Sequence, residues 1–316
     1  MNSKSIIIMI MFLTAAVASY AADDEILPEE YIPDLSADAD MAVAEKPSTA
    51  MSATYGGWVT PIFISDRRGD VSTNSSLTLV KVWGKLSLGG NSFIYIRAKD
   101  LYTKVFSSDN YDGDESKNLI DIDTGYIELA TSRRAFSFAA GRKFFLVGSG
   151  TVLAGRGDGA DIRLRSALAD LQIFGMYTRY LNKDDNPYDR SSKDRDDGAR
   201  RVFAGASAEK RFLNQTAYLF GVIQRDRAAE NATAKIRYQS QYFGGGIKGV
   251  PVDGLDYLIE GVYEQGKSYL YNSSDKKSIG AYALNASANY YINTSMNPAL
   301  SVQYAFASGD NDRYSS

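Results

Sequence analysis

The sequence predicts an all-β chain that folds as an antiparallel transmembrane β-barrel. Three observations support this prediction: thirteen short segments of alternating polarity from residue 54 onward, connections that alternate long and short, and a high aromatic content of 22 tyrosines, 14 phenylalanines and 2 tryptophans. Barrels of an outer membrane have tight turns at one rim, larger loops at the other, and aromatic rings at both interfaces. A soluble sheet has no reason to sort its connections by parity.

Alternation of polar and apolar residues places the predicted strands. They cover residues 54–65, 76–88, 92–103, 122–131, 135–145, 160–167, 170–180, 199–212, 215–226, 234–249, 254–266, 278–292 and 299–308. The even connections carry turn chemistry, as in Gly89-Gly90-Asn91 and Leu213-Asn214. The odd connections are expected to be longer and polar, including residues 107–118, 182–198 and 267–277.

The alternation is clearest late in the chain. In residues 254–266, Tyr257 and Ile259 share one predicted face, while Asp256 and Glu260 share the other. A period of two is that of a strand with unlike faces. In a barrel within lipid, the apolar face turns outward and the polar face lines the lumen.

The N-terminus predicts export. Residues 1–21 are expected to form a signal peptide, because Lys4 precedes the apolar run Ile6–Ala18 and small residues precede Ala22. That run is too short to span a bilayer. Residues 22–53 carry nine acidic residues and one lysine, and are expected to form a flexible periplasmic lead-in. Residues 54–316 form the predicted barrel, with its N-terminus in the periplasm and its long loops outside.

The predicted strand number is odd, whereas bacterial single-chain barrels close with an even number. The last residues, 312–316, resemble the start of an outer loop rather than an apolar closing strand. An open sheet edge is not stable in lipid. We therefore expect the sequence to be truncated at its C-terminus, with several closing strands missing.

The composition excludes several kinds of chemistry. The sequence has no cysteine and no histidine, so disulfides, a Ser-His-Asp triad and histidine-ligated zinc are impossible. We expect no enzyme activity, no cofactor, no metal site and no nucleic-acid partner. The acidic run at residues 109–115 misses the spacing of an EF-hand loop. The tripeptide Arg156-Gly157-Asp158, known from adhesion ligands, is weak evidence by itself.

Basic side chains recur on the polar parity of the predicted strands. Lys81 and Lys85, for example, alternate with Val80 and Val82. A basic residue facing lipid costs about 2–4 kcal/mol at the membrane midplane, so these side chains are expected to line the lumen. Guanidinium groups there would attract anions and bind carboxylates through two hydrogen bonds. The candidate substrate-binding residues are Lys81, Lys85, Arg97, Lys99, Arg142, Arg163, Arg165, Arg201, Arg211 and Arg237.

Acidic residues on the same parity offer a second interpretation. They could neutralise the basic residues across strands and form a rigid ladder of charge pairs. The acidic residues expected on this face are Glu128, Asp161, Glu209, Asp256, Glu260 and Glu264. We expect both effects, with about half of the basic residues paired and the surplus left for solute. Each exposed pair contributes only about 0.2–1 kcal/mol.

Three segments resemble the alginate export family of outer-membrane porins. They are Gly141-Arg142-Lys143 with the glycine-rich run at 148–155, the alternating arginines of residues 161–165, and residues 304–312, which read Tyr-Ala-Phe-Ala-Ser-Gly-Asp-Asn-Asp. Lys143 stands where the family has glutamine, and Thr151 where it has arginine. The resemblance implies a monomeric barrel of eighteen strands with an electropositive pore for an acidic polysaccharide.

The sequence therefore predicts an outer-membrane porin for anionic solutes, with alginate or a similar acidic polysaccharide as the leading candidate. Its expected partners are membrane lipid and that solute. Two alternatives remain open at this point. One is a general diffusion porin whose inner acidic residues cancel the basic ones, and the other is a barrel that presents surface loops for adhesion.

Overall fold

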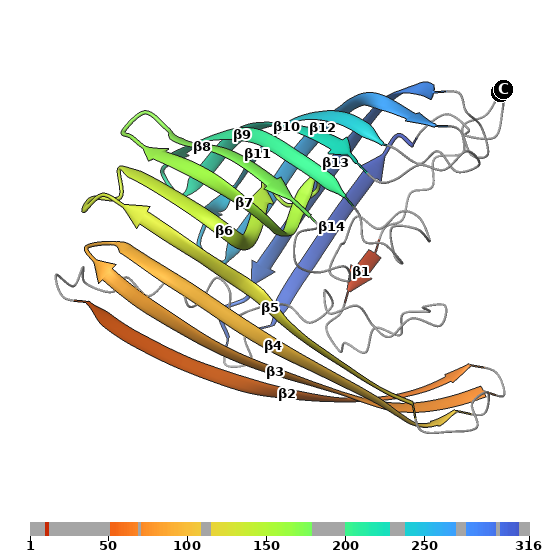
Figure 1. Cartoon of the computed structure of the whole chain (residues 1–316). Helices are drawn as coiled ribbons and strands as arrows, with labels where there is room; N and C mark the ends of the chain where they lie inside the picture. The colour runs from red at the N-terminus through yellow and green to blue at the C-terminus, as the bar shows by residue number, and fades with distance from the viewer. Residues whose placement is uncertain are drawn as a thin grey trace, which may run out of the picture. The chain divides into compact units, whose positions relative to one another are not determined.

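A computed structural model of the whole chain describes residues 10–12, 51–68, 71–108, 115–178, 200–227, 238–269, 276–294 and 298–309. All regular secondary structure within these ranges is β-strand, which confirms the all-β prediction. The strands form an antiparallel sheet in which neighbours follow chain order (Figure 1). Within the described ranges, no helix has the length and apolarity that a membrane crossing requires.

The strand bounds agree with the predicted alternation. The strands are β1 (Ile10–Phe12), β2 (Ser52–Arg68), β3 (Val71–Gly89), β4 (Ser92–Ser108), β5 (Glu115–Ala130), β6 (Phe136–Val147), β7 (Leu153–Arg165), β8 (Asp170–Tyr177), β9 (Arg201–Phe212), β10 (Gln215–Asp226), β11 (Gln239–Val252), β12 (Leu255–Tyr269), β13 (Lys276–Tyr291) and β14 (Ala299–Ala307). Each of the thirteen predicted strands overlaps one of β2 to β14. The short β1 pairs with β14, with Ile10 opposite Gln303.

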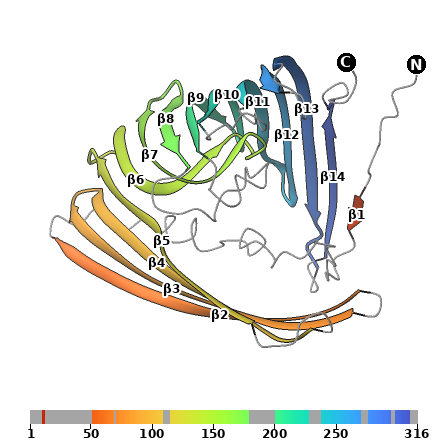
Figure 2. The same cartoon turned by 45° about the vertical axis from the view of Figure 1, so that its right-hand side comes forward.

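The chain forms two compact units. The N-terminal unit contains β2 to β5, β6 as far as Phe144, and Asp158–Ala160 of β7. The C-terminal unit contains Phe145–Gly157, the chain from Asp161 onward, and β1. Figure 1 shows β2 to β5 side by side in the first unit, and Figure 2 shows β12, β13 and β14 side by side in the second.

The connections follow the predicted parity with two exceptions, both among the odd connections. The one between β6 and β7, expected to cover residues 146–159, covers only residues 148–152. The even connections are two to seven residues long, and the three shortest are residues 90–91, 213–214 and 253–254. Among the odd ones, β2 ends at Arg68 and β3 begins at Val71, so the long first loop expected at 66–75 is wrong. The reason is that polar residues such as Ser72 and Thr73 continue the ladder beyond the apolar part of the strand, opposite Arg67 and Asp66.

The two faces of the sheet differ sharply in burial. We call the buried face the side that carries Leu79 and Lys81 in the N-terminal unit and Tyr218 and Glu260 in the C-terminal unit. The opposite side is the exposed face, and it is apolar. Its exposed residues include Val82, Ile96, Ile120, Ile122, Leu219, Ile223, Phe243, Ile259 and Tyr263. So large an exposed apolar surface is rare on soluble proteins and is typical of one that meets lipid.

An apolar cluster lies on the buried face of the C-terminal unit. It is formed by Phe145, Val147, Val152, Leu153, Phe174, Met176, Phe203, Tyr218, Phe220, Val222, Tyr238, Tyr242, Val262 and Ile279. Val147 and Leu153 flank the connection between β6 and β7, and Val152 is its last residue. This connection is therefore packed against the sheet rather than extended into solvent.

Candidate functional site

A β-bulge in β5 shapes the buried face of the N-terminal unit. Arg97 of β4 lies opposite Thr124, whereas the next residue, Ala98, lies opposite Ile122. Asp123 is therefore the extra residue of β5, and Asp123 and Thr124 are both buried. A bulge of this kind re-aims the side chain that it inserts. Here it adds a carboxylate to the buried face.

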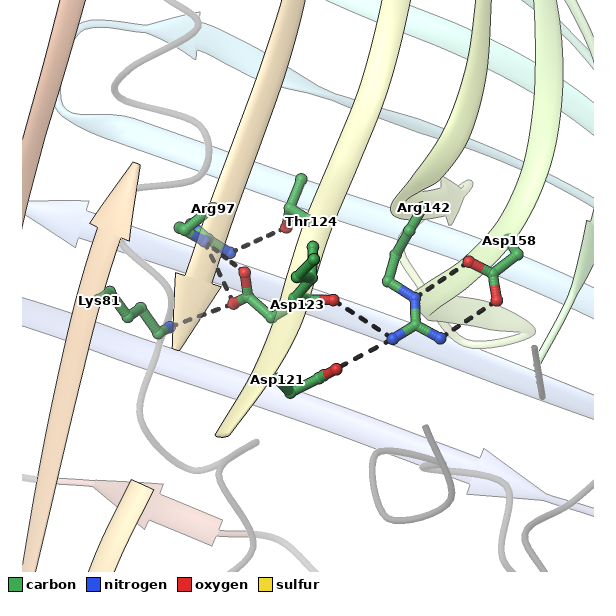
Figure 3. A network of polar contacts seen from close by, with 8 residues as sticks. Lys81, Arg97, Asp121, Asp123, Thr124, Arg142 and Asp158 are labelled. Atoms are coloured by element: carbon green, nitrogen blue, oxygen red, sulfur yellow. Dashed lines mark hydrogen bonds and ion pairs between the residues drawn. The ribbon is translucent and has the colours of Figure 1, made fainter. Parts of the chain in front are cut away.

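Asp123 binds basic side chains from two other strands. Arg97 donates from Nε to both carboxylate oxygens, at 2.9 Å and 3.2 Å, and from Nη2 to the Thr124 hydroxyl at 3.3 Å. Lys81 on β3 places its Nζ 4.0 Å from Asp123 Oδ2 (Figure 3). Arg97 is 3% exposed and Asp123 is 1% exposed. A charged pair at this depth needs such hydrogen bonds to offset its loss of hydration.

Arg142 joins three strands through its guanidinium group. Nε and Nη2 donate to the two oxygens of Asp158 on β7, at 3.0 Å and 3.1 Å. Nη1 donates to the carbonyl oxygen of Ile122 at 3.3 Å and lies 3.6 Å from Asp121 Oδ2 on β5. Figure 3 shows these contacts beside those of Asp123. The two-pronged geometry is available to arginine and not to lysine.

These contacts define what we call the β5 charge network. Its members are Lys81, Arg97, Arg142, Asp121, Asp123 and Asp158. Three cationic and three anionic residues give a formal balance of zero. Among the described side chains of β3 to β6, four more charged residues have the parity of the buried face, namely Lys85, Lys99, Lys143 and Glu128. Adding them gives six cations and four anions, a formal excess of two positive charges.

Aromatic rings accompany several of these cations. Lys81 Nζ and the Arg97 guanidinium carbon lie 5.7 Å and 5.8 Å from the ring centre of Trp58. Lys85 lies 5.0 Å from the ring centre of Phe93. A ring face attracts a cation without neutralising its charge. The arrangement therefore holds cations at the buried face while keeping their positive potential.

The predicted site residues differ in where the structure places them. Lys81, Arg97, Lys99, Arg142 and Arg201 are buried, Lys85 and Arg163 are half-buried, and Arg165 and Arg211 are exposed near strand ends. Arg237 lies outside the described residues. The β5 charge network brings Lys81, Arg97 and Arg142 together. Arg163 and Arg201 belong to other contacts in the C-terminal unit.

Those two arginines also pair with carboxylates. Arg163 Nε lies 2.9 Å from Asp161 Oδ2, and Gln172 donates to the same oxygen at 3.3 Å. Arg201 lies directly opposite Asp226 in the ladder, with 3.9 Å between Nε and Oδ2 and both side chains 1% exposed. Pairing by acidic residues is thus a general property of the buried face.

Arg142 departs from simple alternation. It has the parity of Phe144 and Leu146, which are both exposed, yet Arg142 itself is 8% exposed. Its contacts with Asp121 and Asp158 account for this burial. Alternation alone would have placed Arg142 on the exposed face, with Phe144 and Leu146.

The acidic partners were only partly foreseen. Asp161 does pair with a basic residue, but Glu260 and Glu264 accept hydrogen bonds from hydroxyl groups. The partners of Arg97 and Arg142 were missed. Uninterrupted alternation from Glu128 puts Asp121 and Asp123 on the wrong face, and Asp158 precedes the predicted strand 160–167. A signal was available: the apolar positions shift from 120 and 122 to 127 and 129, which marks the bulge.

Other sequence candidates gain no support. Among the described residues, no group of three or more acidic side chains is placed to hold a metal ion. The acidic run at 109–114 and the loop at 182–198 lie outside the described residues. The tripeptide at 156–158 lies within strand β7, where Asp158 is bound by Arg142.

An antiparallel sheet with an exposed apolar face and a buried, charged face is typical of transmembrane β-barrel proteins. A family profile for alginate export matches residues 67–316. The chain belongs to the alginate export family, a family of outer-membrane β-barrel channels for polysaccharide, as the resemblance indicated. No curated protein matches the chain.

Proposed function

We propose that the chain is an anion-selective outer-membrane channel that passes an acidic polysaccharide, alginate or oligomers of it. The observation that supports this proposal is the depth of the basic residues. Lys81, Arg97 and Lys99 are at most 5% exposed on the buried face, while their strand neighbours Val82 and Ile96 are more than half exposed on the other. In a transmembrane barrel the face opposite the lipid lines a polar interior, where such side chains can act on a passing solute.

The chemistry of the β5 charge network fits a polyuronate. Each uronate unit carries one carboxylate, and Arg97 and Arg142 already bind carboxylates here, those of Asp123 and Asp158. A passing carboxylate would exchange with these internal ones rather than bind in one deep site. Exchange among several weak contacts suits transport, because the solute must also leave.

A non-selective channel is the second candidate. The observation that favours it is the pairing of Arg97, Arg142 and Arg163 with aspartates, which lowers the field available to a solute. The two candidates differ in one quantity, the ratio of anion to cation permeability. The formal excess of two positive charges around the β5 charge network favours the anion-selective channel.

The test is reconstitution of the purified chain in planar lipid bilayers. Under a salt gradient at low ionic strength, the reversal potential should show preference for chloride over potassium, and polyuronate should block the current. Screening should weaken both effects above about 1 M salt, where the Debye length is about 3 Å. A preference for cations, or current that polyuronate leaves unchanged, would contradict the proposal.

The remaining assignments follow from the same proposal. Residues 1–21 serve as a signal peptide, residues 22–53 as a periplasmic lead-in, and residues 54–316 as the channel, which we propose to be monomeric. The channel carries out no catalytic step, in keeping with a sequence that has no histidine to act as a general base.

A further inference from the structure

Glu260 on β12 binds the connection between β6 and β7. We call residues 148–152 the β6–β7 turn. Ser149 donates to Glu260 twice, from its backbone nitrogen to Oε2 and from its hydroxyl to Oε1, both at 2.6 Å. Tyr218 on β10 donates its hydroxyl to Oε2 at 2.9 Å. Glu260 is 1% exposed, so a fully buried carboxylate has three donors, two of them from one turn residue.

This contact spans a large part of the C-terminal unit. β12 stands five places from β7 in the order of strands, and β10 stands three places away. The β6–β7 turn belongs to the connections opposite the tight turns. Glu260, however, is the sixth of the fifteen residues of β12, and Tyr218 is the fourth of the twelve of β10. The turn therefore crosses the buried face and reaches the halves of these strands nearer the tight turns.

Glycines make this close approach possible. Gly148 has a φ of +62°, and a Cβ there would lie 2.2 Å from Glu260 Oε2 and 2.6 Å from the Phe220 ring. On β11, a Cβ at Gly244 would lie 2.3 Å from the same ring. Only glycine fits both positions. The Phe220 ring therefore packs against Gly244 of β11, and Gly148 of the turn packs against the same ring.

Apolar packing fixes the ends of the turn separately from its tip. Val147 and Leu153 belong to the apolar cluster and are 2% and 0% exposed, whereas Thr151 at the tip is exposed. The Ser149 and Thr151 hydroxyls lie 2.8 Å apart. The tip therefore depends on Glu260, while the flanks depend on hydrophobic burial. Removing the carboxylate should release the tip and leave the fold intact.

We propose that the β6–β7 turn is a built-in constriction of the channel, and that Glu260 is the positioning residue that holds its tip across the interior. The turn then sets the largest cross-section that a solute can present, independently of solute charge. This inference rests on the proposed channel function. It assigns a size limit to a part of the chain that the β5 charge network does not include.

The test measures the entry of neutral sugars of increasing size into liposomes that contain the channel. Neutral solutes are used because the change of charge at residue 260 then has little direct effect on the rate. Glu260→Ala removes the acceptor of three hydrogen bonds. The population of the turn bound at residue 260, relative to the unbound population, should therefore fall by about tenfold or more. The swelling rate with a trisaccharide should rise by at least about twofold, with a smaller rise for a monosaccharide.

Two matched variants separate the constriction from other causes. Glu264→Ala removes a carboxylate from the same face of β12, where it accepts from Ser240 and Tyr238 and does not contact the turn. It should leave the size limit unchanged. Glu260→Gln removes the charge but keeps a carbonyl acceptor for Ser149 and Tyr218, so its size limit should lie close to that of the unaltered chain.

A second measurement applies whether or not Glu260→Ala folds. The sequence has no cysteine, so Thr151→Cys introduces a single thiol at the tip of the turn. Attaching a bulky thiol reagent there should lower the conductance by half or more, as expected for an added group in a narrow path (about twofold). The same label on Leu168→Cys, 83% exposed in the tight turn after β7, should not lower it.

The outcomes distinguish this inference from the proposed function. A channel that conducts anions but shows the same size limit with Glu260→Ala, or the same conductance after labelling at residue 151, would overturn the constriction alone. A channel without anion preference whose size limit rises with Glu260→Ala would uphold the constriction and contradict the anion selectivity.

Discussion

Arg97 and Asp123 form a buried pair across a β-bulge, with 2.9 Å between Arg97 Nε and Asp123 Oδ1. Asp123 is the residue that the bulge leaves without a partner between Ile122 and Thr124 in the ladder to β4, and it also lies 4.0 Å from Lys81. A single inserted residue thus supplies the carboxylate that two cations share. The bulge therefore tunes how much positive charge the buried face presents.

Asp123→Asn should increase the preference of the channel for anions. The substitution keeps the shape of the side chain but removes the charge that offsets Lys81 and Arg97. The local excess of positive charge then rises by one, which attracts anions more strongly in a poorly screened interior. The reversal potential under a potassium chloride gradient measures the change, and we expect the permeability ratio to rise by about two- to fivefold.

A control for this variant is Asp253→Asn. Asp253 is exposed in the tight turn between β11 and β12 and is not a member of the β5 charge network. It should leave the permeability ratio unchanged. An unchanged ratio for Asp123→Asn as well would show that the network does not set ion preference.

Arg142→Lys should destabilise the fold although it keeps the charge. Lysine cannot bind both oxygens of Asp158 and also reach the Ile122 carbonyl, as the guanidinium group of Arg142 does. Losing these hydrogen bonds should lower the free energy of unfolding by about 1–3 kcal/mol. Urea denaturation in lipid vesicles measures this value.

The matched comparison is Arg165→Lys, since Arg165 is exposed at the end of β7. Surface substitutions of this kind change stability by about 0.5 kcal/mol or less. Equal free energies of unfolding for the two variants would mean that the two-pronged contact of Arg142 does not stabilise the fold.

Much of the fold was predictable because the strands carry a strict period of two. Glu260 and Val262 are buried while Ile259 and Tyr263 are exposed, as the alternation of β12 requires. The first outer connection was not predictable by this rule. The ends of β2 and β3 continue through polar residues, where backbone pairing persists although no apolar face marks it.

The candidate site was predictable in its cations but not in their partners. Alternation placed Arg97 and Lys99 on the buried face, because a basic residue on the apolar face is too costly in lipid. It misplaced Asp123, because one inserted residue inverts the parity of the rest of a strand. The contact between Ser149 and Glu260 joins residues 111 apart in sequence, and no local pattern encodes it.

Gly148→Ala should destabilise the β6–β7 turn. The added methyl would overlap Glu260 and Phe220, and the φ of +62° disfavours any residue with a Cβ. The left-handed conformation alone costs about 1–2 kcal/mol. Gly261→Ala is the control, because a Cβ there meets nothing within 4 Å. Urea denaturation should show a loss for Gly148→Ala only, and equal losses would mean that the turn is not seated as described.

Ile96→Lys should impair membrane insertion. Ile96 is 52% exposed on the apolar face, directly before Arg97. A lysine on a lipid-facing position lowers stability by about 2–4 kcal/mol near the midplane. Leu213→Lys serves as the comparison, since Leu213 is 93% exposed in a tight turn where lipid is not expected. Folding yield into vesicles measures both variants, and equal yields would argue against lipid at position 96.

The central claim is that the apolar face meets lipid and the basic face meets water, and single cysteines on β3 test it most directly. The chain has no native cysteine, so Lys85→Cys and Val82→Cys each introduce one thiol, on the buried parity and on the exposed face respectively. In reconstituted vesicles, a charged, membrane-impermeant thiol reagent should react with the cysteine at 85 and not with that at 82. Reaction at 82 with protection at 85 would contradict the account.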